Sequence, residues 1–383
     1  MRFAVDAHAI GRHLTGNEVY VRSLLRSFAE LDRDSDFIAC ISEPEAEQSI
    51  PARFRVHYVS ANPYRRLGWD LARMVRSEKP DLVHVQYTAP LLCSAPSVVT
   101  VHDVSFIEHP EYFTGMRSTQ LKLTVSRSVS LAARVITVSE FSRGEILRAY
   151  DISPEKVVAI PNAANPDLRV IGRERAQKAV RASLGFDAPF VFSVGDLQPR
   201  KNHIGLIQAF SLAMTRQPQL QHHLVLTGKE TWFTPKVREA AANSGFSSRI
   251  HFTGFVDDPV LLELYNACDC FVFPSLYEGF GLPILEAMAC GRAVACSNTS
   301  AMPEVADSAA LLFDPASERD LVFAMRDLLL NPEMRQRMER LGVQRAAMFS
   351  WTGSAAKTLE VYYAVAGAAR MAASPLGSAV ARH

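Results

Sequence analysis

The chain alternates short apolar runs of strand length with longer segments in which apolar residues recur at helical spacing. In its first part this alternation predicts crossover units that build a parallel sheet with helices on both faces. The expected strands are Phe3–Val5, Phe37–Ile41, Leu82–Val85, Val98–Val101 and Val135–Val138, and the expected helices lie around Val19–Leu31, Leu67–Val75, Gln120–Ala132 and Phe141–Ala149.

The alternation is interrupted once and then restarts. Residues 161–189 are polar, charged and punctuated by proline and glycine, which is typical of a connection between domains. The pattern therefore predicts an α/β protein of two doubly wound, Rossmann-like domains that face a cleft, where ligands bind outside the carboxyl ends of the strands. After the connection, strands are expected at Phe190–Val194, His223–Leu226, Ile250–Phe252, Cys270–Phe273 and Ala293–Cys296, and helices near Ile204–Met214, Pro235–Asn243, Pro259–Ala267 and Pro283–Cys290.

The last part of the chain is predicted to be helical. The helical pattern runs from Glu318 to about Ala368, and Trp351 opens its final helix. The predicted bounds are 1–165 for the first domain, 186–350 for the second, 351–370 for a C-terminal helix and 371–383 for a flexible tail of small residues.

Composition narrows the class of protein. A chain of 383 residues exceeds one ordinary core, and 48% apolar with 21% charged residues is typical of a soluble globular protein. The net charge of only +1 argues against a general nucleic-acid binder, so no nucleic-acid partner is expected.

Cysteine usage and the N-terminus predict the compartment. The segment MRFAVDAHAI reaches a charge too soon for a signal peptide, and no apolar stretch is long enough for a membrane span. Six cysteines without metal-ligand spacing indicate buried free thiols, and we expect a cytoplasmic protein. Two arginine clusters indicate either a solvated helix face or a patch for a membrane surface or an anion. They are Arg22, Arg26 and Arg33, and Arg65, Arg66, Arg73 and Arg76.

The segment SLYEGFGLPILEAMACG, residues 275–291, combines a glycine-rich loop with a helix start. Pro283 suits the first helical position because its backbone angle is fixed and it has no N–H to leave unpaired. The backbone amides of Phe280, Gly281 and Leu282 are then the unpaired donors of a helix N-terminus, which is a ready site for a phosphate.

Two glutamates flank this helix start. Glu278 lies in the loop and Glu286 lies one turn inside the helix. Carboxylates repel a phosphate but accept hydrogen bonds from hydroxyls, so the layout suits the diols of two sugars on either side of a diphosphate. The alternative is one glutamate that caps the helix and one that is exposed.

A complementary cationic element follows the first strand of the second domain. Residues 193–202, SVGDLQPRKN, turn through Gly195 and present Arg200 and Lys201 before a helix. Two cations at the positive end of a helix are unfavourable without an anion, and together they suit a diphosphate. The alternative is a solvated helix start.

Two further candidates lie in the first domain. Gly16 precedes a helix start whose amides could face a diphosphate, although the segment lacks the three glycines of a dinucleotide fingerprint. His102 ends a strand in the sequence Thr-Val-His-Asp, at the edge where ligands of such sheets bind. A lone histidine of this kind is as often structural.

Together these elements resemble the family 4 glycosyltransferases, which are retaining enzymes of the GT-B fold, from about residue 1 to 365. The most specific part is the Glu-x7-Glu pair inside EGFGLPILEAMACG, and VGDLQPRKN at 194–202 is the second. VHD at 101–103, VSEFSR at 138–143 and IPN at 160–162 also fit. Asn17 and Ala163 stand where relatives often have glycine.

The resemblance implies a role for each candidate in the second domain, which would bind a nucleotide-sugar donor. Arg200 and Lys201 would bind its phosphates, and Glu286 its ribose. Glu278 and the helix start would hold the transferred sugar and the distal phosphate. The loop at Phe255–Val256 would lie against the base. The remaining donor-binding residues implied are Gly195, Phe280, Gly281 and Leu282.

In the first, acceptor-side domain, Gly16 would abut the diphosphate and His102 would lie beside the transferred sugar. The final helix would cross back to this domain. The resemblance implies a front-face reaction in which the leaving phosphate accepts the proton of the acceptor hydroxyl. Arg200, Lys201, Glu278 and His102 would be the catalytic residues, and neither a cofactor nor a metal is implied.

The donor and acceptor are also expectations from the resemblance. The sequence around PRKN resembles that of mannosyltransferases of polysaccharide and O-antigen assembly. The expected donor is therefore GDP-mannose, with UDP- and dTDP-sugars as alternatives. The acceptor would be a saccharide or a lipid-linked saccharide at the inner membrane face, which the protein would contact peripherally. A nucleotide-sugar hydrolase or epimerase, a pyridoxal-phosphate phosphorylase and a non-catalytic nucleotide-binding module are the rival functions.

Overall fold

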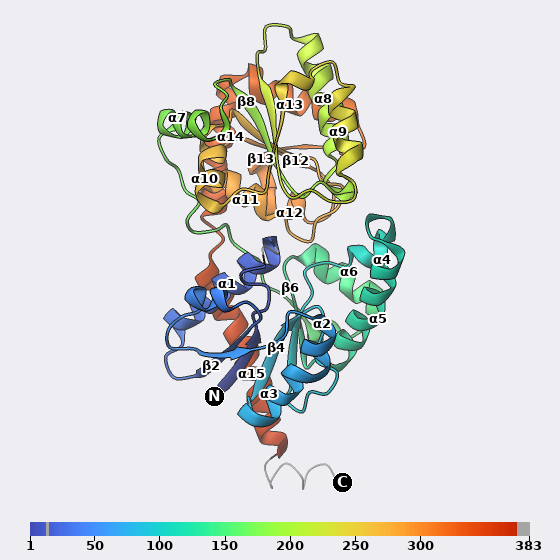
Figure 1. The fold of residues 1–383 in the computed structure, drawn as a ribbon, viewed down its shortest axis with the longest axis vertical. Coiled ribbons are helices and arrows are strands. Elements are labelled where there is room, and N and C mark those ends of the chain that lie inside the picture. Colours follow the sequence, from blue (N-terminus) through green and yellow to red (C-terminus); the bar gives the residue numbers. More distant parts are fainter. Residues whose placement is uncertain (13–14, 374–383) are drawn as a thin grey trace. The chain divides into compact units, whose positions relative to one another are not determined.

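The computed structural model describes residues 1–12 and 15–373 (Figure 1). The chain forms two compact units, one from Met1–Asn162 together with the chain from Ser350 onward, the other from Ala163–Phe349. The predicted domains leave out residues 166–185, which belong to the second unit. Residues 371–373 of the predicted tail are helical, and the rest of that tail lies outside the described residues.

The first unit is built on a parallel sheet of seven strands in the order β3-β2-β1-β4-β5-β6-β7. The chain order reverses at β1 and β4, where Val5 pairs with His84. Such a reversal opens the crevice in which doubly wound sheets bind ligands. The strands are β1 (Arg2–Asp6), β2 (Asp36–Ile41), β3 (Arg55–Tyr58), β4 (Leu82–Gln86), β5 (Ser97–Thr100), β6 (Arg134–Thr137) and β7 (Val157–Ala159).

Helices cover both faces of this sheet (Figure 1). They are α1 (Thr15–Leu31), α2 (Pro63–Arg65), a π-helical turn (Arg66–Asp70), α3 (Leu71–Glu78), α4 (Ser105–Glu108), α5 (Gly115–Leu131), α6 (Glu140–Tyr150) and α15 (Trp351–Ala373), with 3₁₀ turns at Pro44–Ser49, Pro110–Tyr112 and Pro154–Lys156.

The C-terminal helix α15 packs on the first unit, as the sequence predicts. The Tyr362 hydroxyl lies 2.5 Å from Nδ1 of His84 on β4, and Tyr363 donates a hydrogen bond of 2.6 Å to Asp32. The ring of Phe3 on β1 contacts both tyrosine rings. The chain therefore leaves the first unit, forms the second, and returns to complete the core of the first.

The second unit repeats the architecture with six parallel strands in the order β10-β9-β8-β11-β12-β13. Its order reverses at β8 and β11. The strands are β8 (Phe190–Val194), β9 (His223–Thr227), β10 (Ile250–Gly254), β11 (Cys270–Phe273), β12 (Val294–Ser297) and β13 (Ala310–Phe313). The helices are α7 (Arg173–Leu184), α8 (His203–Arg216), α9 (Thr234–Ala242), α10 (Asp258–Ala267), α11 (Leu282–Ala289), α12 (Met302–Ala306), α13 (Glu318–Leu330) and α14 (Pro332–Ala346), with 3₁₀ turns at Pro199–Lys201, Ser247–Arg249 and Asp307–Ala309.

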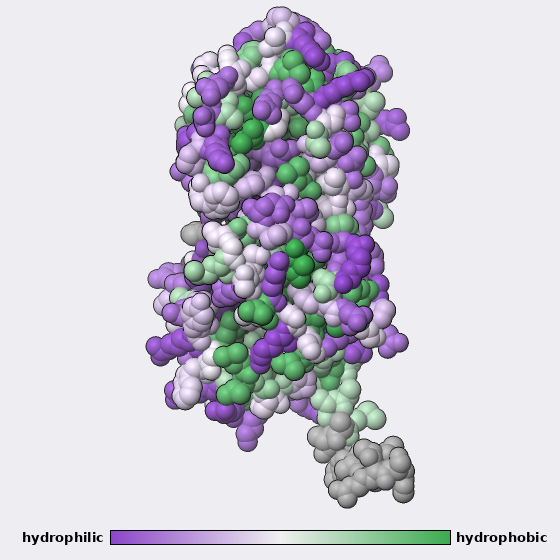
Figure 2. All heavy atoms as spheres, turned by 90° about the vertical axis from the view of Figure 1, so that its right-hand side faces the viewer, coloured by the Kyte–Doolittle hydropathy of each residue, from purple (hydrophilic) through white to green (hydrophobic). Residues whose placement is uncertain are grey.

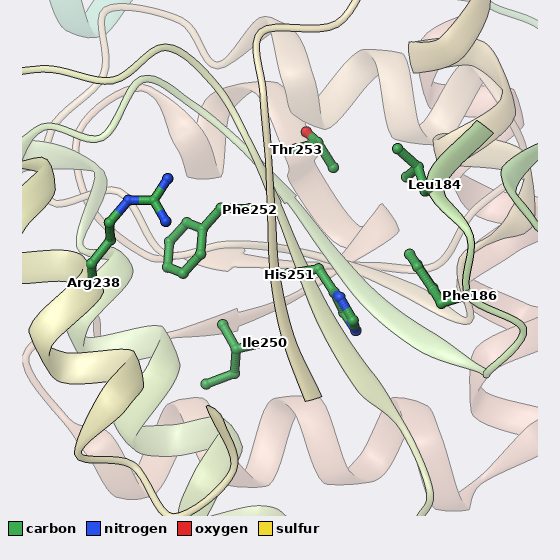
Figure 3. Close-up of a pocket in the computed structure, with 7 residues that line it drawn as sticks. All are labelled: Leu184, Phe186, Arg238, Ile250, His251, Phe252 and Thr253. Atoms are coloured by element: carbon green, nitrogen blue, oxygen red, sulfur yellow. The ribbon is translucent and has the colours of Figure 1, made fainter. Parts of the chain in front are cut away.

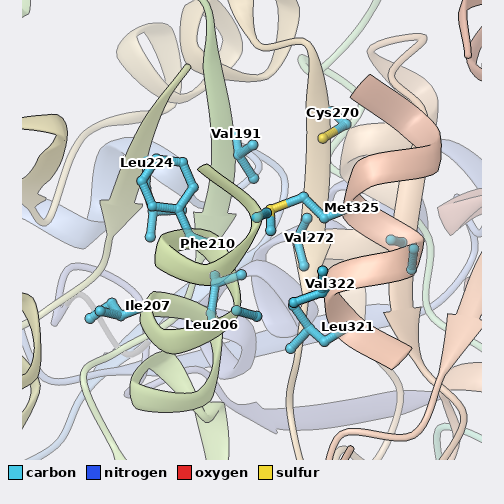
Figure 4. Packing of buried hydrophobic residues seen from close by; sticks show 14 of the residues in the cluster. Val191, Leu206, Ile207, Phe210, Leu224, Cys270, Val272, Leu321, Val322 and Met325 are labelled. Atoms are coloured by element: carbon cyan, nitrogen blue, oxygen red, sulfur yellow. The ribbon is translucent and has the colours of Figure 1, made fainter. Parts of the chain in front are cut away.

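The core on one face of this second sheet lies under α8 and α13 (Figure 4). Phe210 on α8 and Met325 on α13 are fully buried against side chains of the central strands, including Val191 and Val272. Apolar side chains on strands buried on both faces produce the continuous hydrophobic runs from which the strands were predicted.

The strands that the sequence analysis missed are edge strands. β3, β7 and β13 each end a sheet, and β3 buries none of its four side chains fully. Edge strands are covered on fewer sides, so they lack the apolar run that marks a central strand. The boundary between the two units falls inside the predicted connection over 161–189, which also contains the helix α7. The sequence did not indicate α7 because this helix buries only Ala176 and Val180.

No helix in residues 1–12 and 15–373 is long and apolar enough to cross a membrane.

Candidate functional site

The two strongest motifs meet in the second unit because β8 and β11 are neighbouring strands. Phe271 on β11 pairs with Phe192 on β8, so the loops that follow the two strands leave the same edge of the sheet. The backbone N–H of Leu276 donates a 2.7 Å hydrogen bond to the carbonyl of Arg200, which ties the two loops together. The cationic loop and the first glutamate loop therefore form one site at the reversal of strand order.

Glu278 bridges both cations of this site. Its Oε1 accepts a hydrogen bond of 2.5 Å from Lys201 Nζ, and its Oε2 accepts one of 2.8 Å from Arg200 Nη1. Burial alone would raise the pKa of the Glu278 carboxyl, but the charges of Arg200 and Lys201 outweigh it and hold that pKa at about 2. Glu278 is therefore ionised at neutral pH.

This pairing revises the sequence interpretation of the cations. A bound diphosphate was the expected counter-charge of Arg200 and Lys201. The fold supplies an anion from a loop 77 residues away. Glu278 therefore offsets part of the charge of Arg200 and Lys201, in addition to any contact it makes with a sugar.

Lys201 is fixed by close packing around its side chain. It is 8% exposed, and its ammonium lies 4.9 Å from the centre of the Phe273 ring. A Cβ at Gly195 would come within 2.9 Å of Lys201 Cδ, so Gly195 is the residue that lets the lysine stem lie against the backbone after β8. Burial and the neighbouring Arg200 lower the pKa of Lys201.

The second glutamate, Glu286, lies in a different environment. It is 7% exposed, and its Oε2 accepts a 2.9 Å hydrogen bond from the hydroxyl of Tyr265 on α10. Burial raises the pKa of Glu286 to about 7, and the charge of Asp258 adds to the rise, while the bond from Tyr265 opposes it. The pKa of Glu278 is thus lowered and the pKa of Glu286 is raised, because Arg200 and Lys201 lie beside Glu278.

The helix start between the two glutamates lies one residue earlier than predicted, because α11 begins at Leu282 and Pro283 is its second residue. Gly281 caps α11 with φ +104°, a conformation that a side chain would strain, and Pro283 follows in the first turn. We find no protein acceptor for the backbone amides of Phe280, Gly281 and Leu282 in the described part of the chain. These amides are available to an anion.

Val256 lies in the loop between β10 and α10 and is half-buried. The adjacent Phe255 is 49% exposed, and the ammonium of Lys229 lies 5.4 Å from the centre of its ring. An exposed aromatic ring at the carboxyl end of a strand suits the stacking of a nucleotide base, but the contact of this loop with a base remains a prediction.

His102 follows β5 in the first unit, and its ring contacts Gln86 and Tyr20. Its Nε2 lies 2.9 Å from Oε1 of Gln86, and the ring of Tyr20 meets its ring edge-on at 4.8 Å. Burial lowers the pKa of His102 to about 4, so the ring is neutral at physiological pH. Gln86 Nε2 donates a hydrogen bond to the Asn17 carbonyl at 3.5 Å, so the Gln86 atom that faces His102 is the acceptor Oε1. His102 Nε2 therefore carries the proton and donates a hydrogen bond to Gln86, and Nδ1 is the unprotonated acceptor of the ring.

Gln86 therefore links the two candidates of the first unit. Gly16 lies in the first turn of α1 next to Asn17, whose carbonyl Gln86 contacts. The reversal of strand order at β1 and β4 brings the helix start after β1 close to Gln86 at the end of β4. The candidates Gly16 and His102 lie in the first unit and the other candidates lie in the second.

Sequence analysis missed Gln86 and Tyr265. Gln86 directly follows the predicted strand Leu82–Val85 and is the last residue of β4, but a single glutamine has no motif around it. Tyr265 lies inside an apolar helix, where a tyrosine usually indicates core packing. Neither role could be seen before the fold placed the partner residue.

Two overlapping Asp-x-Asp spacings, Asp32-Arg33-Asp34 and Asp34-Ser35-Asp36, lie where α1 leads into β2, and such pairs can bind metals. Asp32 Oδ1 accepts hydrogen bonds from the amides of Asp34 and Ser35, and Oδ2 accepts one from Tyr363. Asp32 closes the turn between α1 and β2, at the amino end of the sheet. Among the described residues no cluster of three or more histidines, cysteines and carboxylates could hold a metal ion.

A surface hollow elsewhere in the second unit contains none of the candidates (Figure 3). It follows the edge strand β10, and Leu184, Phe186 and Arg238 line it together with residues 250–253. His251 in this hollow is stacked on Phe186 at 4.5 Å. The hollow does not include the carboxyl ends of β8 and β11, so it is separate from the candidate site.

Two family models match the chain. The model described as Glycosyltransferase Family 4 matches residues 14–168, and the model described as Glycosyl transferases group 1 matches residues 176–345. The chain is 33% identical over 272 residues to O-antigen chain mannosyltransferase B of Escherichia coli, with 70% of each protein covered. It is also 33% identical over 233 residues to the serotype-specific mannosyltransferase WbdA of Escherichia coli, covering 60% of this chain and 28% of that protein.

The fold has a close match among solved structures. Sucrose-phosphate synthase from Thermosynechococcus elongatus superposes with a TM-score of 0.78 at 20% identity, over 96% of this chain and 100% of that one. The predicted GT-B fold, with two Rossmann-like domains, is confirmed. The family matches and the Escherichia coli relative confirm the predicted resemblance, and the chain belongs to glycosyltransferase family 4.

Proposed function

We propose that the chain is a retaining mannosyltransferase that moves mannose from GDP-mannose to a hydroxyl of a saccharide or a lipid-linked saccharide during O-antigen-type assembly. The observation that carries the proposal is the pairing of Arg200 and Lys201 with Glu278 at the edge of the second sheet, beside a helix start with available amides. The 33% identity to O-antigen chain mannosyltransferase B supports mannose as the sugar.

The donor would bind to the second unit, where its diphosphate, ribose and transferred sugar would each contact a different set of polar groups. The diphosphate would face Arg200, Lys201 and the amides at the start of α11. The ribose diol would donate to Glu286, and the transferred sugar would contact Glu278. Hydroxyls donate to carboxylates and phosphates accept from cations, so each contact pairs groups of complementary chemistry.

The reaction would follow a front-face course. The bond between the anomeric carbon and the diphosphate oxygen breaks, the acceptor oxygen bonds to that carbon on the same face, and the leaving phosphate takes the acceptor proton. Arg200 and Lys201 stabilise the charge that grows on the leaving group, and His102, neutral at physiological pH, accepts a hydrogen bond from the sugar. We propose that no metal is needed, because two fixed cations already serve the diphosphate.

A donor panel tests this proposal. The purified chain is incubated with GDP-mannose, UDP-glucose or dTDP-glucose, with and without a mannose-terminated acceptor, and with a chelator in a parallel series. We expect transfer only from GDP-mannose and only with acceptor, an α-linked product by NMR, and no effect of the chelator. Release of free mannose without acceptor would favour the hydrolase, and tight GDP binding without turnover would favour a non-catalytic module.

We also propose that the first unit contacts the inner face of the membrane, where a lipid-linked acceptor lies. Trp69 and Leu92 are each 63% exposed, and Leu91 is 59% exposed. The amide of Leu91 donates to the carbonyl of Leu67, and Arg127 on α5 donates to the carbonyl of Leu91 at 2.7 Å, so this loop connects the π-helical turn to α5. Figure 2 shows hydrophobic side chains among hydrophilic ones on the face of the molecule that carries α5.

Exposed arginines occur in the same segment of the chain as Trp69. Arg65, Arg73 and Arg76 are exposed, whereas Arg66 is buried and pairs with Asp6 at 3.4 Å, so Arg66 does not belong to the surface cluster predicted from sequence. Aromatic and apolar side chains with arginines suit an anionic membrane surface.

Sedimentation with phosphatidylglycerol vesicles tests this contact. We expect Trp69→Ser with Leu92→Ser to lower binding, and Trp232→Ser, which changes a tryptophan of similar exposure in the second unit, to leave it unchanged. Equal binding by both variants would contradict the membrane contact.

A further inference from the structure

Tyr265 is a buried tyrosine whose hydroxyl contacts Glu286, the residue proposed to bind the ribose. It lies on α10, is fully buried, and packs edge-on against Phe192 at 5.2 Å and tilted against Phe271 at 5.4 Å. These rings belong to the two central strands β8 and β11, which carry the site loops. The position of the phenol oxygen is therefore fixed by the same strands that position the cations.

The hydrogen bond of this phenol is directional. Tyr265 donates to Oε2 of Glu286 at 2.9 Å, and within the described residues we find no other protein hydrogen bond to the Glu286 carboxylate. One oxygen is therefore held by a rigid donor, and Oε1 remains for another donor. A glutamate side chain has rotatable bonds that a ligand would otherwise have to immobilise at a cost in conformational entropy.

We propose that Tyr265 is a positioning residue for donor binding, which holds Glu286 so that its free oxygen receives the ribose diol of the nucleotide. This inference rests on the proposed function of the same site. Tyr265 touches no substrate in this account. It acts through the carboxylate, so its removal should affect only ligands that carry the diol.

The charged neighbours of Glu286 make the effect pH-dependent. Besides Tyr265, the titratable groups found to interact with this carboxylate among the described residues are Asp258 at the start of α10 and the thiol of Cys290 after α11. Asp258 disfavours the ionised form, whereas the Tyr265 hydrogen bond favours it. Without the phenol, the pKa of Glu286 rises further, and a larger share of the carboxyl is protonated near neutral pH.

The test compares Tyr265→Phe with the wild type by calorimetric titration with GDP and with 2′,3′-dideoxy-GDP. Tyr150→Phe is the matched control, because it removes a buried phenol oxygen for which the described chain offers no hydrogen-bond partner. We expect Tyr265→Phe to weaken GDP binding about tenfold, which corresponds to about 1.4 kcal/mol. Dideoxy-GDP should bind the wild type and Tyr265→Phe equally, and Tyr150→Phe should bind GDP like the wild type.

Two further measurements separate positioning from a general effect on the fold. The pH midpoint of GDP binding should move upward in Tyr265→Phe, and Glu286→Ala combined with Tyr265→Phe should bind GDP no more weakly than Glu286→Ala alone. Equal losses for GDP and dideoxy-GDP, or unchanged GDP binding, would overturn the role of Tyr265 alone. A wild type that binds neither nucleotide would overturn the proposed function as well.

Discussion

Lys201 and Glu278 are 77 residues apart in sequence, and the lysine ammonium lies 2.5 Å from the glutamate oxygen. The parallel pairing of β8 with β11 produces this contact, because the loops that carry the two residues leave adjacent strands at the same edge. The two motifs that identify the family are therefore parts of one electrostatic unit, in which a buried carboxylate and two cations hold one another in place.

We predict that Arg200→Ala and Lys201→Ala each lower kcat/KM by about 10²–10³-fold, because each removes a fixed cation from the leaving diphosphate. The two variants should differ in stability. Lys201 is 8% exposed, and removing one partner of a buried pair costs about 3–5 kcal/mol, whereas Arg200 is more exposed and should cost less. Steady-state kinetics and urea unfolding measure both effects. Activity within a few-fold of the wild type in both variants would remove the assigned role.

We predict that Glu286→Gln stabilises the protein in a pH-dependent way. Burial raises the pKa of Glu286 from 4.5 to about 7, so the folded chain keeps a proton that the unfolded chain loses. The carboxyl is protonated in both states below pH 4.5, and its contribution to stability falls as the pH rises to about 7.

The neutral amide does not ionise and should keep its contribution over this range. The unfolding temperature of Glu286→Gln should therefore match the wild type near pH 4.5 and exceed it above pH 7, as measured by differential scanning calorimetry in the absence of nucleotide. A difference that is the same at both pH values would show that the carboxyl has no raised pKa.

We predict that His102→Ala impairs sugar transfer more than it impairs nucleotide binding. His102 lies in the first unit, and its pKa of about 4 leaves it neutral, so it contributes a hydrogen-bond acceptor rather than a charge. The kcat for transfer should fall while the Kd for GDP stays within about twofold, and the wild-type rate should show no titration of His102 between pH 6 and 8. A parallel loss of GDP affinity would assign the histidine to the fold or to another site.

The sequence predicts the central strands, the tandem Rossmann-like units and most motif residues. Central strands appear as continuous apolar runs, and the motif loops have characteristic residues at fixed spacing. Edge strands such as β13 and the polar helix α7 lack a clear apolar pattern, since few of their side chains are buried. The sequence also singles out Arg200, Lys201 and the two glutamates, Glu278 and Glu286, as candidates, and their roles stay predictions.

The pairing of these residues could not be predicted in the same way. The contacts of Lys201 with Glu278 and of Tyr265 with Glu286 join segments whose proximity depends on strand order and helix packing. A sequence interpretation therefore assigned Glu278 to a sugar without seeing that it also neutralises the cations.

The most direct test of the account is a calorimetric titration of Glu278→Ala and Glu286→Ala with GDP, combined with transfer kinetics. Glu286 is assigned to the ribose, which does not change during reaction, so its loss should weaken GDP binding and raise the donor KM. Glu278 is assigned to the sugar and neutralises the cations, so its loss should lower kcat while GDP binds at least as tightly as to the wild type. Loss of GDP binding in Glu278→Ala with normal binding in Glu286→Ala would reverse the two roles, and normal binding and turnover in both would contradict the proposed site.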